Sequence, residues 1–192
     1  LKVVLFKHKH HTPTPKMKPL GKNELLLKAL LQYYHNNPGH TLQLFCIIRY
    51  KSSVSLRILD WLVTNYSKNR NICYNVKGKE FNMYLAYKSC LKAFSKKAFD
   101  PFARRDRIAL NIHPIHPDEA LHTTVAQLNF FRWCFANDVL KYAIRNEERV
   151  NCDMVHAIQH RYIRDKGGRK RRELSKNNTV TNIRVGVVTP LV

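Results

Sequence analysis

Apolar residues at helical spacing are the feature that most constrains this chain. Four segments, residues 23–35, 52–66, 79–97 and 118–136, repeat large apolar residues every three or four positions. Because that spacing puts the residues on one side of a helix, each segment has an apolar face to bury. Hydrophobic residues make up 44% of the chain, which is enough for a core. The sequence predicts a mainly α fold, of the α+β class, with a compact helical core.

The residues on these apolar faces are the predicted core. They are Leu26, Leu27, Leu30, Leu31 and Tyr34 in the first segment, Leu56, Leu59, Leu62, Val63 and Tyr66 in the second, Phe81, Tyr84, Leu85, Leu91 and either Phe94 or Phe99 in the third, and Val125, Leu128, Phe131 and Phe135 in the fourth. A further helix is expected over residues 147–164, with Met154, Ile158 and Tyr162 at matching positions.

Segment boundaries follow from capping and turn residues. Ser52 or Ser53 is expected to cap the second helix, and the Asn-Asn-Pro-Gly run at 36–39 to end the first. Residues 41–50 fit either a buried strand or a short helix, because they are apolar without a clear period. Residues 69–78 are expected to form a turn-rich link.

Both ends of the chain differ from this helical middle. Residues 1–22, with three prolines and no acidic residue, predict an extended basic N-terminal arm. Residues 23–165 are expected to form the helical core domain. Residues 166–192 are predicted to be a basic linker and a C-terminal β-strand, since Thr181, Ile183, Val185 and Val187 alternate. This strand is expected to pair with the N-terminal apolar segment or with a neighbouring chain.

Charge indicates the class of partner. The chain has 34 Lys and Arg against 13 Asp and Glu, a formal charge of +21. A protein of this charge attracts polyanions, so nucleic acid, an anionic membrane surface or acidic proteins are the expected neighbours. Two clusters concentrate the charge, and the predicted partner-binding or polyanion-binding residues are Lys88, Lys92, Lys96, Arg104, Arg105 and Arg107 in one and Arg161, Arg164, Arg169, Lys170, Arg171 and Arg172 in the other.

The first cluster is expected to be a cationic helix end followed by a cationic loop. Its three lysines stand four residues apart and share one helix face. Asp100-Pro101 ends the helix, and the arginines follow in the loop. Phe94 and Phe102 are expected to lie in the core, which leaves the charges outside. Both clusters are also compatible with an ordinary solvated surface.

Catalytic and metal motifs are absent from the sequence. It holds no phosphate-binding glycine loop, no G-x-S-x-G and no H-E-x-x-H. The five cysteines form no C-x-x-C, and Cys90 is expected to be a core thiol. His113 and His116 stand three apart without an obvious third ligand. We therefore expect no enzyme, no cofactor, no metal and no small-molecule substrate, and neither a signal peptide nor a membrane-spanning segment.

Three stretches carry a family resemblance. They read SVSLRILDWLVTNYSK at 53–68, YKSCLKAFSKKAFDPFARRDRI at 87–108 and HTTVAQLNFFRWCFANDVLKY at 122–142. In this order and spacing, the chain resembles a conserved, poorly characterised protein of the nucleocytoplasmic large DNA viruses, the giant viruses. The resemblance covers residues 52–145 and implies no catalytic residues. Where the family often has Cys this chain has Ala103, which argues against a metal or redox role at that position.

The resemblance implies a virion protein assembled in the host cytoplasm. Our first hypothesis is a non-enzymatic minor capsid component, which cements neighbouring capsid proteins on the inner side of an icosahedral shell. Its basic surface would then face acidic protein or the inner viral membrane. The alternative is a basic nucleic-acid-binding protein, associated with the genome or with transcription, whose lysines and arginines contact phosphates.

Overall fold

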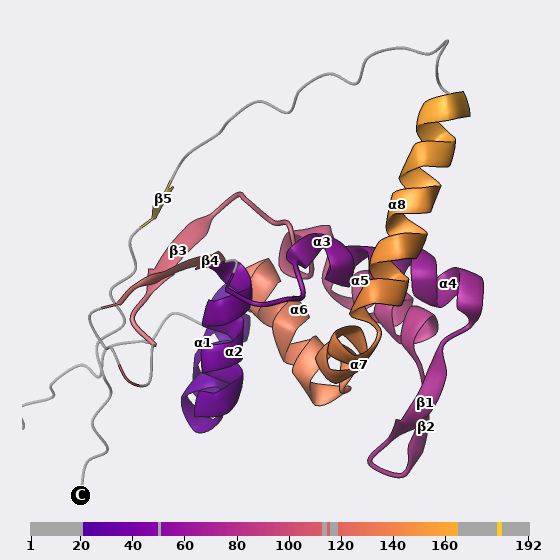
Figure 1. Cartoon of the computed structure of the whole chain (residues 1–192). Helices are drawn as coiled ribbons and strands as arrows, with labels where there is room; N and C mark the ends of the chain where they lie inside the picture. The colour runs from indigo at the N-terminus through magenta and orange to yellow at the C-terminus, as the bar shows by residue number, and fades with distance from the viewer. Residues whose placement is uncertain (1–20, 50, 113–114, 116–118, 165–179, 182–192) are drawn as a thin grey trace, which may run out of the picture.

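A computed structural model describes residues 21–49, 51–112, 115, 119–164 and 180–181 of the chain. Its first half is helical, interrupted by one hairpin (Figure 1). The elements in order are α1 (Lys22–Asn36), α2 (Pro38–Ile48), α3 (Leu56–Trp61), the π-helical turn η1 (Leu62–Tyr66), α4 (Ser67–Arg70), β1 (Cys73–Val76), β2 (Lys79–Asn82) and α5 (Met83–Ala98).

The second half adds two strands and three helices. These are β3 (Arg107–Leu110), β4 (Leu121–Thr124), α6 (Val125–Ala136), α7 (Val139–Arg145) and α8 (Glu147–Arg164), followed by the two-residue strand β5 (Val180–Thr181). The predicted mainly α fold is confirmed. Residues 41–50, for which strand and helix were both open, are helical over most of their length, because α2 begins at Pro38 and continues to Ile48.

Helix α6 is the centre of the core. Seven of its twelve residues are buried, including Phe130 and Phe131, so it is covered on several sides rather than along one stripe. It packs against α1 and α5 (Figure 1). Two polar contacts fix these neighbours: the Tyr34 hydroxyl donates to the Leu128 carbonyl at 2.8 Å, and the Asn129 amide donates to the Ala98 carbonyl at 2.9 Å.

Strands β1 to β4 form two small antiparallel pairs. Strands β1 and β2 pair from Cys73↔Asn82 to Val76↔Lys79, and the turn between them places Lys77 and Gly78 at φ 50° and φ 79°. Two consecutive positive φ angles give the twist of a tight hairpin, and glycine adopts one of them without strain. Strands β3 and β4 pair from Arg107↔Thr124 to Leu110↔Leu121.

Several predicted boundaries are wrong. Ser55, rather than Ser52 or Ser53, caps α3, since its hydroxyl accepts from the Ile58 amide at 3.2 Å. The supposed link at 69–78 contains β1 and the hairpin turn. Helix α5 begins at Met83 instead of near Lys79, because Asn82 ends β2 and its side chain caps the helix through the Leu85 amide.

The predicted core is largely correct, with exceptions in and after α5 and in α8, where Ile158 is 38% exposed. Leu85 is 62% exposed, and Phe94 and Phe102 are each 39% exposed, so their assignment to the core is wrong. The helix faces its neighbours through Met83 and Tyr87 instead. Phe99, the alternative to Phe94, is buried to 1% exposure. The backbone leaves the helix between Phe94 and Phe99, and the spacing of apolar residues does not indicate where a helix ends.

Within the predicted C-terminal segment 166–192, the structure describes only the two residues of β5. The two residues of β5 pair in parallel with Arg107 and Ile108 of β3, a partner that the sequence did not predict. The rest of the predicted C-terminal strand, the predicted N-terminal arm up to residue 20 and most of the basic linker lie outside the described residues. The division into an arm, a core domain and a linker stays a prediction.

His40 gives a prediction about pH. Its Nδ1 lies 2.8 Å from the Tyr33 hydroxyl, and its ring stacks on Phe135 with centroids 4.5 Å apart. Burial lowers the pKa of His40, the nearby Lys141 charge lowers it further, and Asp138 opposes them. The unfolded chain therefore takes up this proton more readily than the folded protein does, so stability present above the ordinary histidine pKa of about 6.5 is lost as pH falls below it.

The measurement is the free energy of unfolding in urea at about pH 8 and about pH 5. His40→Gln should lose less stability between these two conditions than the wild type loses, because glutamine does not titrate. Equal losses in both proteins would show that other groups account for the acid sensitivity.

Candidate functional site

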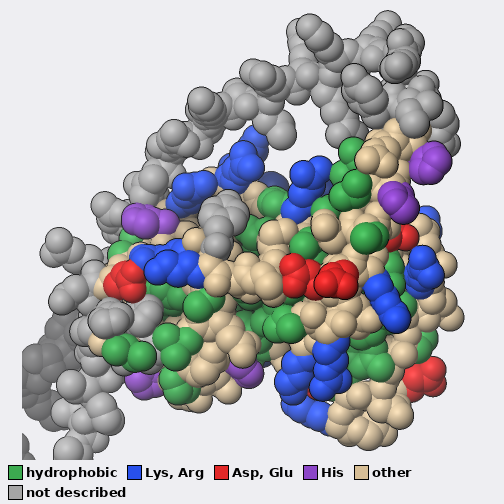
Figure 2. All heavy atoms as spheres, in the orientation of Figure 1, with side chains coloured by type: hydrophobic (Ala, Val, Ile, Leu, Met, Phe, Trp, Pro, Cys, Tyr) green, Lys and Arg blue, Asp and Glu red, His purple; other side chains and the backbone are tan. Residues whose placement is uncertain are grey.

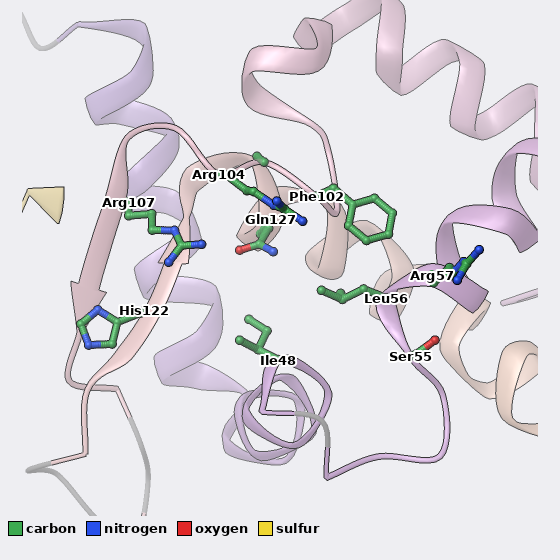
Figure 3. Close-up of a pocket in the computed structure, with 10 residues that line it drawn as sticks. Ile48, Ser55, Leu56, Arg57, Phe102, Arg104, Arg107, His122 and Gln127 are labelled. Atoms are coloured by element: carbon green, nitrogen blue, oxygen red, sulfur yellow. The ribbon is translucent and has the colours of Figure 1, made fainter. Parts of the chain in front are cut away.

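A pocket of about 430 Å³ opens between the end of α2, the start of α3, the loop after α5, and strands β3 and β4 (Figure 3). One part of its lining is apolar and the other is cationic. The apolar residues are Ile48, Leu56, Phe102 and Ala103. The cationic and titratable residues are Arg57, Arg104, Arg107 and His122. Ser55 and Gln127 complete the lining.

The loop that follows α5 is pinned on both sides of Pro101. The backbone N–H of Phe102 donates to the Asp100 carboxylate at 2.8 Å. The side-chain Nε2 of Gln127 donates to the Pro101 carbonyl at 2.7 Å. Asp100-Pro101 ends the helix as the sequence predicted, because proline cannot donate the next helical hydrogen bond. The loop therefore presents Phe102 at a fixed place on the rim of the pocket.

Gln127 is itself held by the start of α6. The Thr124 hydroxyl caps this helix, because it accepts a hydrogen bond from the backbone N–H of Gln127 at 3.1 Å. The buried Thr123 hydroxyl donates to Gln127 Oε1 at 3.2 Å. Both ends of the Gln127 side chain are thus engaged by the protein, and this part of the pocket is pre-formed.

Positive charge dominates the pocket. None of its lining residues is acidic, and Arg104 and Arg107 extend toward the space that Ile48 and Leu56 border, with Arg57 at the far end (Figure 3). Within the part of the chain that the structure describes, none of the three arginines forms an ion pair. Blue Lys and Arg side chains gather along the upper edge of the molecule, over β3 and α3 (Figure 2). Such a site attracts an anion.

The lysine stripe is less regular than the sequence predicted. Lys88 and Lys92 are exposed on α5, but Ser95 has non-helical angles (φ 57°, ψ 168°) that interrupt the helix before Lys96. Lys96 therefore does not continue the same face. A serine in this region of φ is strained, because its Cβ meets the backbone. None of the three lysines lines the pocket.

Lys96 interacts with the Asp60 carboxylate instead. Burial raises the pKa of Asp60, the neighbouring Asp100 carboxylate raises it further, and the Lys96 ammonium opposes both. The lysine thus offsets negative charge on the protein itself. Among the described residues no three His, Cys, Asp or Glu side chains come together as metal ligands would, and Asp60 with Asp100 stays a pair.

The remaining predicted site residues are spread out. Arg105 is exposed beside Arg104 but does not line the pocket. Arg161 and Arg164 belong to the last turn of α8. The other predicted site residues, Arg169, Lys170, Arg171 and Arg172, lie outside the described part of the chain, as do His113 and His116. The structure therefore joins only Arg104 and Arg107 of the predicted set.

Sequence reasoning missed Arg57 and His122. Arg57 lies on α3, some fifty positions before the arginine loop, and His122 lies on β4 after it. Each is an ordinary exposed residue of its own element, so no local pattern marks it.

Neither Cys90 nor Cys134 is an activated nucleophile. Burial raises the pKa of both the Cys90 and Cys134 thiols, which disfavours the reactive thiolate. Cys134 is fully buried in α6, and Cys90 is half-buried in α5.

None of the helices in the described ranges combines the length and apolarity that crossing a membrane requires.

Comparison with known proteins places the chain in a group without an assigned activity. Residues 12–184 match a family of unknown function, DUF7197. The uncharacterized protein L507 of Acanthamoeba polyphaga mimivirus is 30% identical over 176 residues, which make up 88% of this chain. The chain spans 62% of the length of that relative. No solved structure matches the chain.

Proposed function

We propose that this chain, which belongs to the DUF7197 family, is a non-enzymatic nucleic-acid-binding protein of a giant virus, with the basic pocket as its phosphate-contacting site. The observation that carries the proposal is the pocket itself: three arginines and a histidine around one cavity, with no acidic residue in its lining. Arginine suits phosphate, because its planar guanidinium offers parallel N–H donors and stays charged at every physiological pH.

Chain-wide charge supports the same function. A formal +21 over 192 residues favours binding to any polyanion, and it adds a long-range attraction to the local contacts. Lys88 and Lys92 are exposed and able to contribute to this attraction without lining the pocket. The proposal therefore separates two contributions, a diffuse one from net charge and a local one from the pocket arginines.

The test compares two double charge reversals. Arg104→Glu with Arg107→Glu changes the pocket, and Lys88→Glu with Lys92→Glu makes the same change in net charge on α5. We expect the pocket variant to bind DNA at least about tenfold more weakly at low salt, and its log–log salt slope to be shallower by about 2, one for each lost phosphate contact. The matched lysine variant should lose much less.

Fluorescence anisotropy of a labelled oligonucleotide, titrated at several salt concentrations, gives both quantities. Thermal unfolding of each variant checks that the fold is retained. If the two variants lost affinity equally, binding would follow net charge alone and the pocket would not be the site.

A structural role in the virion is the second candidate, and helix α8 favours it. Its C-terminal part extends beyond the rest of the helical core (Figure 1), and it carries the apolar side chains of Val155 and Ile158 partly exposed. A helix that presents apolar residues away from its own core suits docking on another protein. We propose neighbouring capsid proteins, or the inner viral membrane surface, as partners in that role, with the virion as the location.

The pocket variant also separates the two candidates. The capsid role would be favoured if the Arg104→Glu with Arg107→Glu variant failed to enter virus particles but, once purified, bound DNA as tightly as the wild type. Normal incorporation with lost DNA binding would favour the nucleic-acid role.

A further inference from the structure

We infer that the pocket accepts one unstacked nucleotide of a single strand, with its base against Phe102 and its phosphates on Arg104 and Arg107. This rests on the proposed function and goes further, because it names the form of nucleic acid. Positive charge alone would attract single strands and duplexes alike. The apolar half of the pocket is what distinguishes them.

The size of the pocket suits a nucleotide. Its volume of about 430 Å³ falls within the range of about 300–1,000 Å³ that is usual for cavities which enclose a small organic group. A duplex presents phosphates and groove edges, while its base faces are stacked inside. A single strand is able to rotate one base out and insert it.

Phe102 provides a surface on which a base is able to stack. The side chain is 39% exposed, although it is a large apolar group, and within the described residues its ring contacts no other aromatic ring. It borders the same cavity as Leu56 and Ile48, which form an apolar wall around the central space (Figure 3). Stacking would remove this exposed apolar surface from water.

Phosphate binding falls to the arginines that line the same cavity (Figure 3). Arg104 follows Phe102 by two residues and Arg107 begins β3, and both line the same cavity as the ring. This order of an aromatic ring followed by arginines matches the combination of stacking and charge that single-strand-binding proteins use.

Base identity is not read in this arrangement. Gln127 is the amide side chain of the pocket, and its nitrogen and oxygen are already bound to Pro101 and Thr123. We therefore expect little preference among bases, because stacking accepts any base face.

The experiment measures the affinity of the full chain for oligothymidine of about 15 nucleotides and for a duplex of the same length. Wild type should bind the single strand more tightly than the duplex at equal salt. Phe102→Ala should weaken single-strand binding by between roughly 5- and 150-fold, the usual range for one lost stacking contact, and leave duplex binding unchanged. Phe102→Trp should restore single-strand binding, and its fluorescence should be quenched as the base stacks.

Phe94→Ala is the matched control. Phe94 is equally exposed, at 39%, but it does not line the pocket and its ring stacks on Phe99 with centroids 6.3 Å apart. Its removal should leave the ratio of single-strand to duplex affinity unchanged.

Three results would overturn the inference. One is equal single-strand and duplex affinity in the wild type. Another is equal weakening of single-strand and duplex binding by Phe102→Ala, and the third is no effect of that variant on either affinity. In all three cases the proposed nucleic-acid-binding function survives if Arg104→Glu with Arg107→Glu still weakens binding. Absence of salt-dependent binding by the wild type would instead contradict the proposed function and the inference together.

Discussion

Phe99→Ala is expected to destabilise the protein by about 3–5 kcal/mol, the range for removal of a fully buried aromatic ring. The Phe99 ring is 1% exposed and lies 5.5 Å from Phe130, 5.7 Å from Trp133 and 5.9 Å from Tyr87, measured between centroids. Truncation removes all of these contacts and leaves a cavity that the rigid aromatic neighbours fill poorly. Urea denaturation followed by circular dichroism measures the loss.

Phe94→Ala is the control for this prediction as well. Because Phe94 is partly exposed and keeps only one face on Phe99, its loss should cost about 1 kcal/mol. Similar costs for the two variants would mean that Phe94 belongs to the core after all, as the helical spacing first indicated.

Tyr34→Ala is also expected to lower the free energy of unfolding by about 3–5 kcal/mol. This ring is 1% exposed, packs edge-on against Tyr33 at 5.2 Å, and donates its hydroxyl to the Leu128 carbonyl of α6. Burial raises the pKa of Tyr34, so its hydroxyl stays protonated and able to donate at all ordinary pH values. The side chain therefore both fills space and fastens α1 to the central helix.

Tyr34→Phe isolates the hydrogen bond. It keeps the ring and removes only the hydroxyl, so we expect a loss of about 1 kcal/mol. Thermal or urea unfolding of both variants gives the comparison. A phenylalanine variant as unstable as the alanine variant would show that the hydrogen bond, and not the packing, dominates this contact.

Neither stability prediction bears on binding directly, and this makes the two sets of variants complementary. Phe99 and Tyr34 lie in the core, whereas Phe102, Arg104 and Arg107 line the pocket. Variants of the pocket should keep the wild-type free energy of unfolding within about 1 kcal/mol. A pocket variant that unfolds easily would not be a test of binding and should be replaced by Arg104→Gln.

The sequence by itself determined the class of the fold and most of its core. Regular spacing of apolar residues depends only on neighbours three and four positions away, so it identifies the buried faces of α1, α3 and α6 without tertiary information. The stop at Asp100-Pro101 is likewise local, because proline removes a donor wherever it stands. The strongly basic charge, and with it the polyanion hypothesis, also comes from composition alone.

Tertiary structure decided where local rules compete. The spacing of α5 allowed Phe94 or Phe99 in the core, and the break at Ser95 selected Phe99. The same break separates Lys96 from the lysines before it and leaves it beside Asp60. Neither result follows from periodicity, because a helix pattern says nothing about a backbone that leaves the helix under the influence of distant contacts.

The pocket, too, exists only in three dimensions. Arg57, Arg104 and His122 come from a helix, a loop and a strand, and they line one cavity because α3 and β4 both border it together with the loop after α5. Two of the pocket arginines belong to a basic run in the sequence, but nothing in the sequence indicates that Arg107 lines the pocket and that Arg105 does not. Which surface residues face one cavity depends on how the helices pack, and that packing is set by contacts between residues far apart in the chain.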